Sequence, residues 1–176
     1  TRELSLQITE ELRALARFIP GVRIACLYGG QPIVKQLNQL KQNPQIIVAT
    51  PGRLLDHMER GNVRLSSVHT MVLDEADEML DMGFVDDMEE IMRNLPDERQ
   101  TLLFSATMPR PILSLTKKYM KAPKNVAVSK EDLTVPLIEQ YYYETKDKIE
   151  GLCRLLDAEI DGKLIIFCRT KKGVDD

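Results

Sequence analysis

The stretch from Val72 to Asp77 constrains the fold of this chain most, because two β-favouring residues run directly into an acidic tetrapeptide. Val72 and Leu73 end a short apolar run that is typical of a strand buried on both faces of a parallel sheet. Doubly wound α/β folds bind their ligands just beyond the carboxyl ends of such strands. The stretch therefore predicts a buried strand that delivers carboxylates to a ligand site.

Two chemistries are open to these carboxylates. Magnesium prefers hard oxygen ligands and keeps several waters, so one or two carboxylates plus substrate phosphates can hold it. In that case Asp74 is the metal-binding candidate, acting through water, and Glu75 is the candidate for orienting a water molecule. Alternatively, the acids only cap the following helix, since carboxylates are favoured in a first helical turn. The spacing leaves both interpretations open.

The rest of the chain alternates between helical and strand patterns. Apolar residues recur at helical spacing in six segments, at about 1–19, 32–41, 51–58, 79–95, 109–120 and 146–159. Short apolar or alternating runs predict strands at 22–28, 46–49, 68–73, 101–104, 138–144 and 163–168, with 125–128 extended. Strands separated by helices predict an α/β fold with a doubly wound parallel sheet.

A polar stretch without periodicity interrupts this alternation at 129–136. Such a stretch is typical of a linker between domains. We therefore expect a first domain over 1–128, a linker over 129–136 and the start of a second domain over 137–176.

Other segments with binding chemistry also follow predicted strands directly. They are Gly29-Gly30, the run from Thr50 to Arg53, Ser105-Ala106-Thr107, and the run from Phe167 to Thr170. Because the carboxyl ends of parallel strands meet at one edge of a sheet, we expect these segments to gather there with the acids.

The run Thr50-Pro51-Gly52-Arg53 has the chemistry of a phosphate grip. Free N–H groups at a helix start attract anions, Gly52 allows close backbone approach, and Arg53 can donate two hydrogen bonds to a phosphate. The alternative is a simple turn or cap, for which Gly, Pro and Thr are also favoured. The same two possibilities apply to Gly29-Gly30.

Composition excludes several classes of site. The chain has 43% hydrophobic residues and a net charge of -3, so any nucleic-acid site must be local rather than a general basic surface. Cys26, Cys153 and Cys168 are widely separated and no His clusters with them, which argues against a zinc site and for a reducing compartment. No apolar run approaches the roughly 18 residues of a spanning helix, so we expect a cytoplasmic protein without a membrane segment.

Taken together, the motifs resemble bacterial-type DEAD-box ATP-dependent RNA helicases. Asp74-Glu75-Ala76-Asp77 matches the signature of that family, and the other matching segments occur in family order: Thr1-Arg2-Glu3-Leu4, Gly29-Gly30, Thr50-Pro51-Gly52-Arg53, Ser105-Ala106-Thr107 and Leu164-Ile165-Ile166-Phe167. The resemblance implies most of a first RecA-like domain of the P-loop NTPase type, incomplete at its N-terminal side, and the beginning of a second.

The resemblance also implies ATP and Mg²⁺ as cofactors and RNA as the partner, held by its sugar-phosphate backbone independently of sequence. It assigns ATP hydrolysis and its coupling to strand separation to Asp74, Glu75, Asp77, Ser105 and Thr107, with Asp77 as partner of the Ser105 to Thr107 triplet. It assigns RNA binding to Thr1, Arg2, Gly29, Gly30, Thr50, Pro51, Gly52, Arg53, Phe167, Arg169 and Thr170. Proteins of ribosome assembly or RNA decay are the protein partners it suggests.

Three elements that the resemblance leads us to expect are not found in the chain: an adenine-reading Gln motif, the G-x-x-x-x-G-K-[ST] phosphate loop and an Arg-rich motif of the second domain. The chain begins inside a motif and is interpreted as a fragment that is inactive alone. One rival interpretation is a truncated RNA-binding or regulatory module without ATP hydrolysis. Another is an unrelated doubly wound phosphohydrolase with Asp74 as nucleophile or metal ligand, which leaves the other motifs unexplained.

Overall fold

The computed structural model describes residues 1–127, 139, 141–158 and 163–170. Contacts between Cα atoms divide the chain into two compact units, Thr1–Asn125 and Val126–Asp176. All strands in the described part of the chain belong to the first unit.

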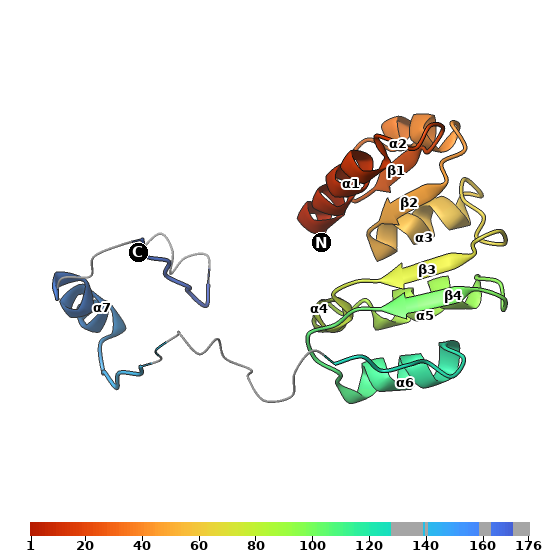
Figure 1. The fold of residues 1–176 in the computed structure, drawn as a ribbon. Helices are drawn as coiled ribbons and strands as arrows, with labels where there is room; N and C mark the ends of the chain where they lie inside the picture. The colour runs from red at the N-terminus through yellow and green to blue at the C-terminus, as the bar shows by residue number, and fades with distance from the viewer. Residues whose placement is uncertain (128–138, 140, 159–162, 171–176) are drawn as a thin grey trace. The chain divides into compact units, whose positions relative to one another are not determined.

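Four short parallel strands organise the first unit: β1 (Ile24–Leu27), β2 (Ile46–Ala49), β3 (Thr70–Leu73) and β4 (Gln100–Leu103). They pair as β1 with β2 and β3 with β4, with Ile24 opposite Ile46 and Thr70 opposite Gln100. All four point the same way, so their carboxyl ends lie at one side of the unit (Figure 1). Parallel neighbours need a crossover between them, and a helix follows each strand.

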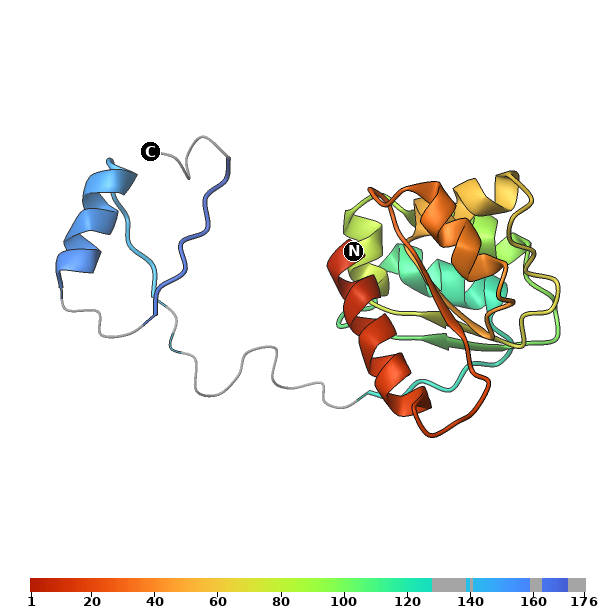
Figure 2. The same ribbon diagram turned by 90° about the horizontal axis from the view of Figure 1, so that it is seen from above.

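Helices lie on both sides of β1, as a doubly wound fold requires. The helix α1 (Arg2–Ala16) packs against β1 and β2 on one side, and α2 (Ile33–Leu40) packs against β1. On the side opposite α1, Figure 2 shows a layer formed by α3 (Pro51–Glu59), α5 (Val85–Arg93) and α6 (Arg110–Tyr119). The predicted α/β class is thus confirmed. The predicted burial of the strand ending at Leu73 on both faces is wrong, because Leu73 is buried but the side chain of Val72, on the other face of β3, is 50% exposed.

The core lies where this helical layer meets the strands. Leu27 and Leu73 are buried on the strands, and Met88 and Ile112 are fully buried on α5 and α6. The methionines of α5 therefore fill the core, as their spacing predicts. This packing holds the carboxyl ends of β1, β3 and β4 in fixed positions beside the helices.

The predicted helical segment 79–95 is in fact two helices, α4 (Ala76–Asp81) and α5. Gly83 separates them with φ +82°, and its N–H donates to the carbonyl of Leu80. A left-handed glycine is a common way to end a helix, because it carries no Cβ that would clash. The apolar spacing continues across this break, which explains why periodicity alone predicts one helix.

The predicted strand at 163–168 is wrong. These residues form no strand, and the side chains of Ile165 and Phe167 are 76% and 92% exposed. In the strand predicted at 138–144, residues 139 and 141–144 also form no strand, while 138 and 140 lie outside the described residues. Residues 125–127, predicted to be extended, have no regular secondary structure, and 128 lies outside the described residues. An apolar run becomes a strand only when a neighbour completes its hydrogen bonds, and the described part of the second unit contains no strand.

The helix predicted at 146–159 is confirmed as α7 (Lys148–Asp157). Its N-cap is Asp147, whose carboxylate accepts hydrogen bonds from the N–H groups of Ile149 and Glu150. This local bonding explains how the helix begins without help from a sheet.

Candidate functional site

A groove of about 450 Å³ lies between β2 and β3. Neither strand has a partner on this side, because β2 pairs only with β1 and β3 only with β4. The groove extends past the strand ends and brings together residues from α1, β2 and β3, among them Thr1, Val48, Thr50, Pro51, Leu73, Asp74, Glu75 and Met79. The predicted gathering is thus confirmed for Thr50, Pro51 and the first two acids, whereas Gly29, Gly30, Arg53, Ser105 and Thr107 do not line the groove; Thr1, which is not among the segments expected to gather, does line it.

The acids at the end of β3 do not act as ordinary helix caps. Glu75 occupies the N-cap position of α4 but makes no side-chain capping bond. The carboxylate of Asp74 accepts one hydrogen bond, 3.0 Å from the Glu75 N–H, and lines the groove. The capping interpretation therefore does not account for either residue.

Glu75 also has an unusual backbone, with φ 52° and ψ 49° in the left-handed region. A non-glycine residue there costs roughly 1–2 kcal/mol relative to the right-handed conformation. The strain is maintained by neighbours, since the next N–H, of Ala76, donates to the carbonyl of Phe104 at 3.1 Å. This conformation leaves the Glu75 side chain exposed beside the groove.

The third acid, Asp77, contacts the triplet that follows β4, as the sequence predicts. Its Oδ2 accepts from the N–H and from the hydroxyl of Thr107, each at 2.8 Å. Ser105 plays a different part, because its Oγ accepts from the N–H of Asp77 at 3.0 Å. The Thr107 hydroxyl therefore binds the side chain of Asp77, and the Ser105 hydroxyl binds its backbone.

These bonds change the acidity of Asp77. The Thr107 hydroxyl stabilises the ionised carboxylate most, with further help from Ser105 and the Thr107 N–H, whereas partial burial acts in the opposite direction. The net effect lowers the pKa of Asp77 from 3.8 to about 2. At neutral pH Asp77 is a fixed anion that accepts hydrogen bonds and is unsuited to be a general base.

Thr1 and Thr50 have different environments. The hydroxyl of Thr1 caps α1 by accepting from the Leu4 N–H at 3.2 Å. Thr50 precedes Pro51 at the start of α3 but makes no side-chain capping bond. The sequence left open whether this run binds phosphate or only caps the helix. The Thr50 hydroxyl does not cap α3.

A buried polar network behind the run from Thr50 to Arg53 is absent from the sequence predictions. Gln36 and His57 are both fully buried. The Gln36 amide donates to the carbonyl of Tyr28 at 2.8 Å, and its oxygen lies 2.9 Å from Nε2 of His57. Nη1 of Arg53 donates to the same oxygen at 3.2 Å and to the carbonyl of Gln31 at 3.0 Å. The network ties the start of α3 to the loop after β1.

The signal for this network was present in the sequence. Gln36 is three residues from Ile33 and His57 three residues from Leu54, so both polar side chains lie on faces that spacing predicts to be apolar. A polar residue at such a position must find a partner, since an unpaired buried polar group costs about 1–3 kcal/mol.

The glycines and Arg2 lie in open surroundings. A Cβ on Gly29 would meet nothing within 4 Å, and one on Gly52 only Asp87 at 3.7 Å. Contacts with neighbouring atoms therefore do not explain why glycine, rather than a residue with a side chain, occupies positions 29 and 52. Gly30 has φ +82°, a conformation that favours glycine, and a Cβ added there would lie 3.8 Å from Nη1 of Arg2. The guanidinium carbon of Arg2 lies 5.2 Å from the centre of the Tyr28 ring.

Phe167, Arg169 and Thr170 belong to the second unit. Phe167 and Arg169 are exposed in a segment without regular structure. The groove belongs to the first unit, and the RNA-binding role predicted for these three residues stays a prediction.

The acids at the groove suit a hard cation held mainly by water. The described residues contain no cluster of three or more His, Cys, Asp or Glu side chains that could hold a metal. Asp74 has one carboxylate oxygen without a hydrogen bond, which fits Mg²⁺ binding through water together with substrate phosphates. Among the described residues, no helix is long and apolar enough to cross a membrane.

The model of the DEAD/DEAH box helicase family matches residues 1–115. The chain belongs to this family. The "DEAD-box ATP-dependent RNA helicase CshA" of Geobacillus kaustophilus is 51% identical over 178 aligned positions, covering 100% of this chain and 38% of that protein. The protein of the same name in Bacillus subtilis is 49% identical, and 36% of its length is covered. The chain thus spans well under half of the length of these relatives.

Solved structures agree with the family assignment. A hypothetical ATP-dependent RNA helicase from Sulfolobus tokodaii superposes with a TM-score of 0.68 and 40% identity, over 70% of this chain and 37% of that one. A DEAD box protein from Methanococcus jannaschii gives a TM-score of 0.66 and 48% identity, over 69% and 33% respectively. The α/β fold with parallel strands is therefore that of DEAD-box helicase domains.

Proposed function

We propose that this chain is part of an ATP-dependent RNA helicase that couples ATP hydrolysis to local duplex unwinding or remodelling of RNA–protein complexes. The observation that carries the proposal is the contact between Asp77 and Thr107, which joins the acidic segment at the groove to the triplet after β4. A structural link of this kind can transmit the state of a nucleotide site to a neighbouring strand end. The names of the relatives support the same activity.

Within the groove, Asp74 is the proposed ligand of Mg²⁺ through water, and Glu75 the proposed residue that orients the attacking water. A bound Mg²⁺ would neutralise the charge that develops on the phosphoryl oxygens of ATP. Glu75 suits its role because its side chain is exposed beside the groove and its carboxylate is not occupied by capping. Asp77 is proposed to couple rather than to hydrolyse, since its carboxylate is already engaged.

RNA is the proposed partner, gripped through its sugar-phosphate backbone. The exposed glycines 29, 30 and 52 leave room for a backbone to approach, and the Thr50 hydroxyl is not used as a cap. Arg2, beside Gly30, supplies a cation. Contacts of this type position a strand without reading its bases. Phe167, Arg169 and Thr170 are proposed to contact RNA from the second domain.

For domain organisation we propose a first RecA-like domain over 1–128, a linker over 129–136 and the start of a second over 137–176. The contact boundary at Asn125 supports this division. A cytoplasmic location and partners in ribosome assembly or RNA decay remain proposals that rest on the family resemblance alone.

The test is the variant Glu75→Gln in the full-length protein, measured for ATP binding and RNA-stimulated hydrolysis. The amide keeps the size of the side chain but cannot take a proton, so hydrolysis should slow by about 100-fold or more while ATP binding persists. Asp81→Asn is the matched control, because it removes a carboxylate from α4 that does not line the groove. Normal hydrolysis by Glu75→Gln would remove Glu75 from the mechanism.

A further inference from the structure

Charge is distributed very unevenly around β4. Residues 74–98 contain eleven Asp or Glu and a single Lys or Arg, whereas residues 99–127 contain six Lys or Arg and no acid. The family match ends within the basic segment, at residue 115. A chain with a net charge of -3 thus concentrates positive charge on α6 and the segment that follows it.

Part of this charge is neutralised within the fold. Lys118 and Arg93 both pair with Glu89, at 2.7 and 3.1 Å, and the guanidinium of Arg99 donates to the carbonyls of Pro96 and Tyr119. These contacts fix the end of α6 against α5. Four exposed cations remain that pair with no carboxylate in the described part of the chain: Arg110, Lys117, Lys121 and Lys124. We name these four residues the basic ridge.

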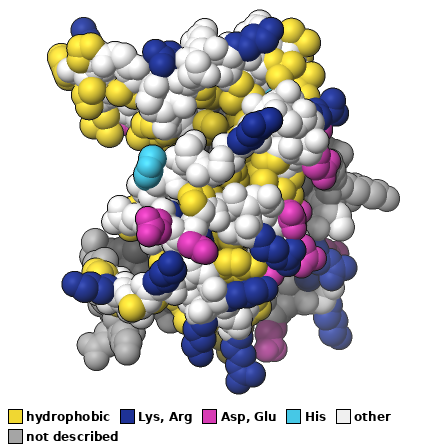
Figure 3. All heavy atoms as spheres, turned by 90° about the vertical axis from the view of Figure 1, so that its right-hand side faces the viewer, with side chains coloured by type: hydrophobic (Ala, Val, Ile, Leu, Met, Phe, Trp, Pro, Cys, Tyr) yellow, Lys and Arg dark blue, Asp and Glu magenta, His cyan; other side chains and the backbone are white. Residues whose placement is uncertain are grey.

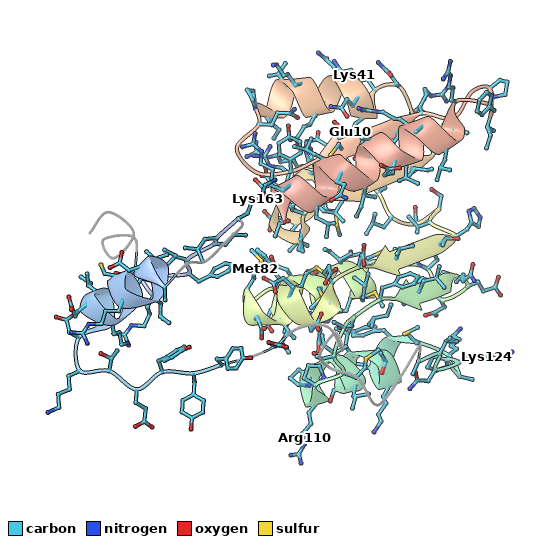
Figure 4. All side chains as sticks on the ribbon, turned by 60° about the vertical axis from the view of Figure 1, so that its left-hand side comes forward. Glu10, Lys41, Met82, Arg110, Lys124 and Lys163 are labelled. Carbon is cyan, nitrogen blue, oxygen red and sulfur yellow. The ribbon has the colours of Figure 1, made fainter. Side chains whose placement is uncertain are left out.

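Helical geometry places the two ridge residues of α6 on its outward side, and Lys121 and Lys124 follow the helix. Arg110 and Lys117 are seven residues apart, which leaves them within about 20° of each other around the helix. Ile112 and Leu115, on the other side of the helix, are buried at 0% and 2% exposure. Figure 4 shows the labelled side chains of Arg110 and Lys124 at the two ends of this region, both pointing away from the body of the unit.

A hollow of about 570 Å³ adjoins the ridge at the amino end of β4. Its lining includes Lys118 at the end of α6, Lys121 just after it, Arg93 and Arg99, against one carboxylate, that of Asp97. Figure 3 looks at this side of the unit and shows Lys and Arg side chains gathered along its lower part, over α6 and the segment after it. The surface is thus a concave, positively charged strip.

We propose that the basic ridge binds the phosphate backbone of a second stretch of RNA, outside the stretch held at the strand ends. This inference rests on the proposed function. RNA is favoured over an acidic protein because four unpaired cations spread along this surface suit delocalised contact with evenly spaced phosphates; the exposed apolar side chain beside Arg110 and Lys117 is that of Leu113, at 41% exposure. The carboxyl-terminal end of α6, which carries Lys117, lies toward the amino end of β4 (Figure 1), whereas Gly29 and Thr50 follow the carboxyl ends of β1 and β2, so we expect a short RNA at the strand ends not to reach Lys117 and Lys121.

The experiment compares two RNAs and three variants of the full-length protein. The ridge variant carries Lys117→Gln and Lys121→Gln. The matched control carries Arg13→Gln and Lys41→Gln, which are also exposed and form no ion pair with the residues that the structure describes. A third variant with Lys117→Arg and Lys121→Arg keeps the charge. The RNAs are a single strand of about ten nucleotides and one several times longer.

With the long RNA, the ridge variant should bind roughly tenfold more weakly near 0.2 M salt, and its slope of log affinity against log salt should fall by about 1.5. The charge-keeping variant and the control should bind like wild type. With the short RNA, all proteins should bind alike. Circular dichroism and thermal melting verify that each variant is folded.

Two results would overturn the inference in different ways. If wild type binds both RNAs and the ridge variant keeps its affinity and salt slope for the long one, the ridge does not bind RNA, and an acidic protein becomes the candidate partner. If wild type binds neither RNA, both the ridge and the proposed function fail.

Discussion

Thr107 donates two hydrogen bonds to one carboxylate oxygen of Asp77, from its N–H and its hydroxyl, each 2.8 Å long. The two residues are 30 positions apart and meet because β3 and β4 are paired in register. Ser105 completes the contact through the Asp77 N–H. The acidic segment and the triplet therefore form one unit, although they belong to different strand ends.

This contact predicts that ATP hydrolysis and duplex unwinding can be separated. With Ser105→Ala and Thr107→Ala in the full-length protein, Asp77 loses its side-chain partners while Asp74 and Glu75 stay in place. A hydrogen bond to a charged group contributes about 1.5–3 kcal/mol, enough to shift a closed-state equilibrium. Unwinding should fall much more than ATPase activity. An equal fall in both rates, measured on one preparation, would place these hydroxyls in the hydrolytic machinery.

A second prediction concerns acid stability. Because the folded pKa of Asp77 is about 2 and its ordinary value is 3.8, the unfolded chain binds the proton first. The contribution of Asp77 to stability is therefore complete above about pH 4 and is lost as pH falls toward 2. Thr107→Val should raise the pKa of Asp77, measured by NMR titration, and weaken this acid dependence. Asp77→Asn is the control, because it should abolish the contribution of Asp77 to the pH dependence of stability. If the pKa of Asp77 did not shift in Thr107→Val, the Thr107 hydroxyl would not be the cause of its low value.

A third prediction follows from the burial of His57. Burial disfavours the imidazolium and lowers the pKa of His57 from 6.5, although the nearby Asp56 carboxylate acts in the opposite direction. The unfolded chain is therefore protonated first, and stability should decline as pH falls below about 6.5. Urea unfolding between pH 7.5 and 5 tests this. His57→Gln should flatten that part of the curve, and parallel curves for the two proteins would refute it.

The fourth prediction distinguishes a residue that contacts RNA phosphate, Arg53, from one that only positions it, Gln36. In the full-length protein, Arg53→Ala should weaken RNA binding alike for unrelated sequences and reduce the salt slope by about 0.7, as the loss of one phosphate contact does. Gln36→Leu removes the partner of Arg53 and His57 without removing a charge, so RNA affinity should fall while the salt slope stays unchanged.

Arg60→Ala is the matched control for this pair, because Arg60 is exposed at the end of α3 and, among the described residues, forms an ion pair with Asp56 alone. It should change neither affinity nor slope. Gln36→Leu should also destabilise the chain by roughly 1–3 kcal/mol, because buried polar groups lose their partner. If Gln36→Leu reduced the slope as much as Arg53→Ala, the distinction between the two roles would be lost.

By itself, the sequence determined the elements of the first unit and the chemistry at their ends. Periodicity reports which side of an element is buried, so it predicts α1, α3 and the four strands to within a few residues. Parallel strands put their carboxyl ends together, so Thr50 and Asp74 could be placed at one groove without coordinates.

Only the tertiary structure decided which atoms of these groups meet. The family resemblance implied Asp77 as partner of the triplet, but not that the Thr107 N–H and hydroxyl bind one oxygen of Asp77 while Ser105 binds its N–H. The contact between Gln36 and His57, 21 positions apart, arises from the docking of helices and is contained in no local pattern. The run at 163–168 is a case in which a local pattern predicts an element that the fold does not form. Its apolar residues favour a strand, yet they form none, because a strand requires backbone hydrogen bonds from a neighbour and these come from the fold rather than from the segment.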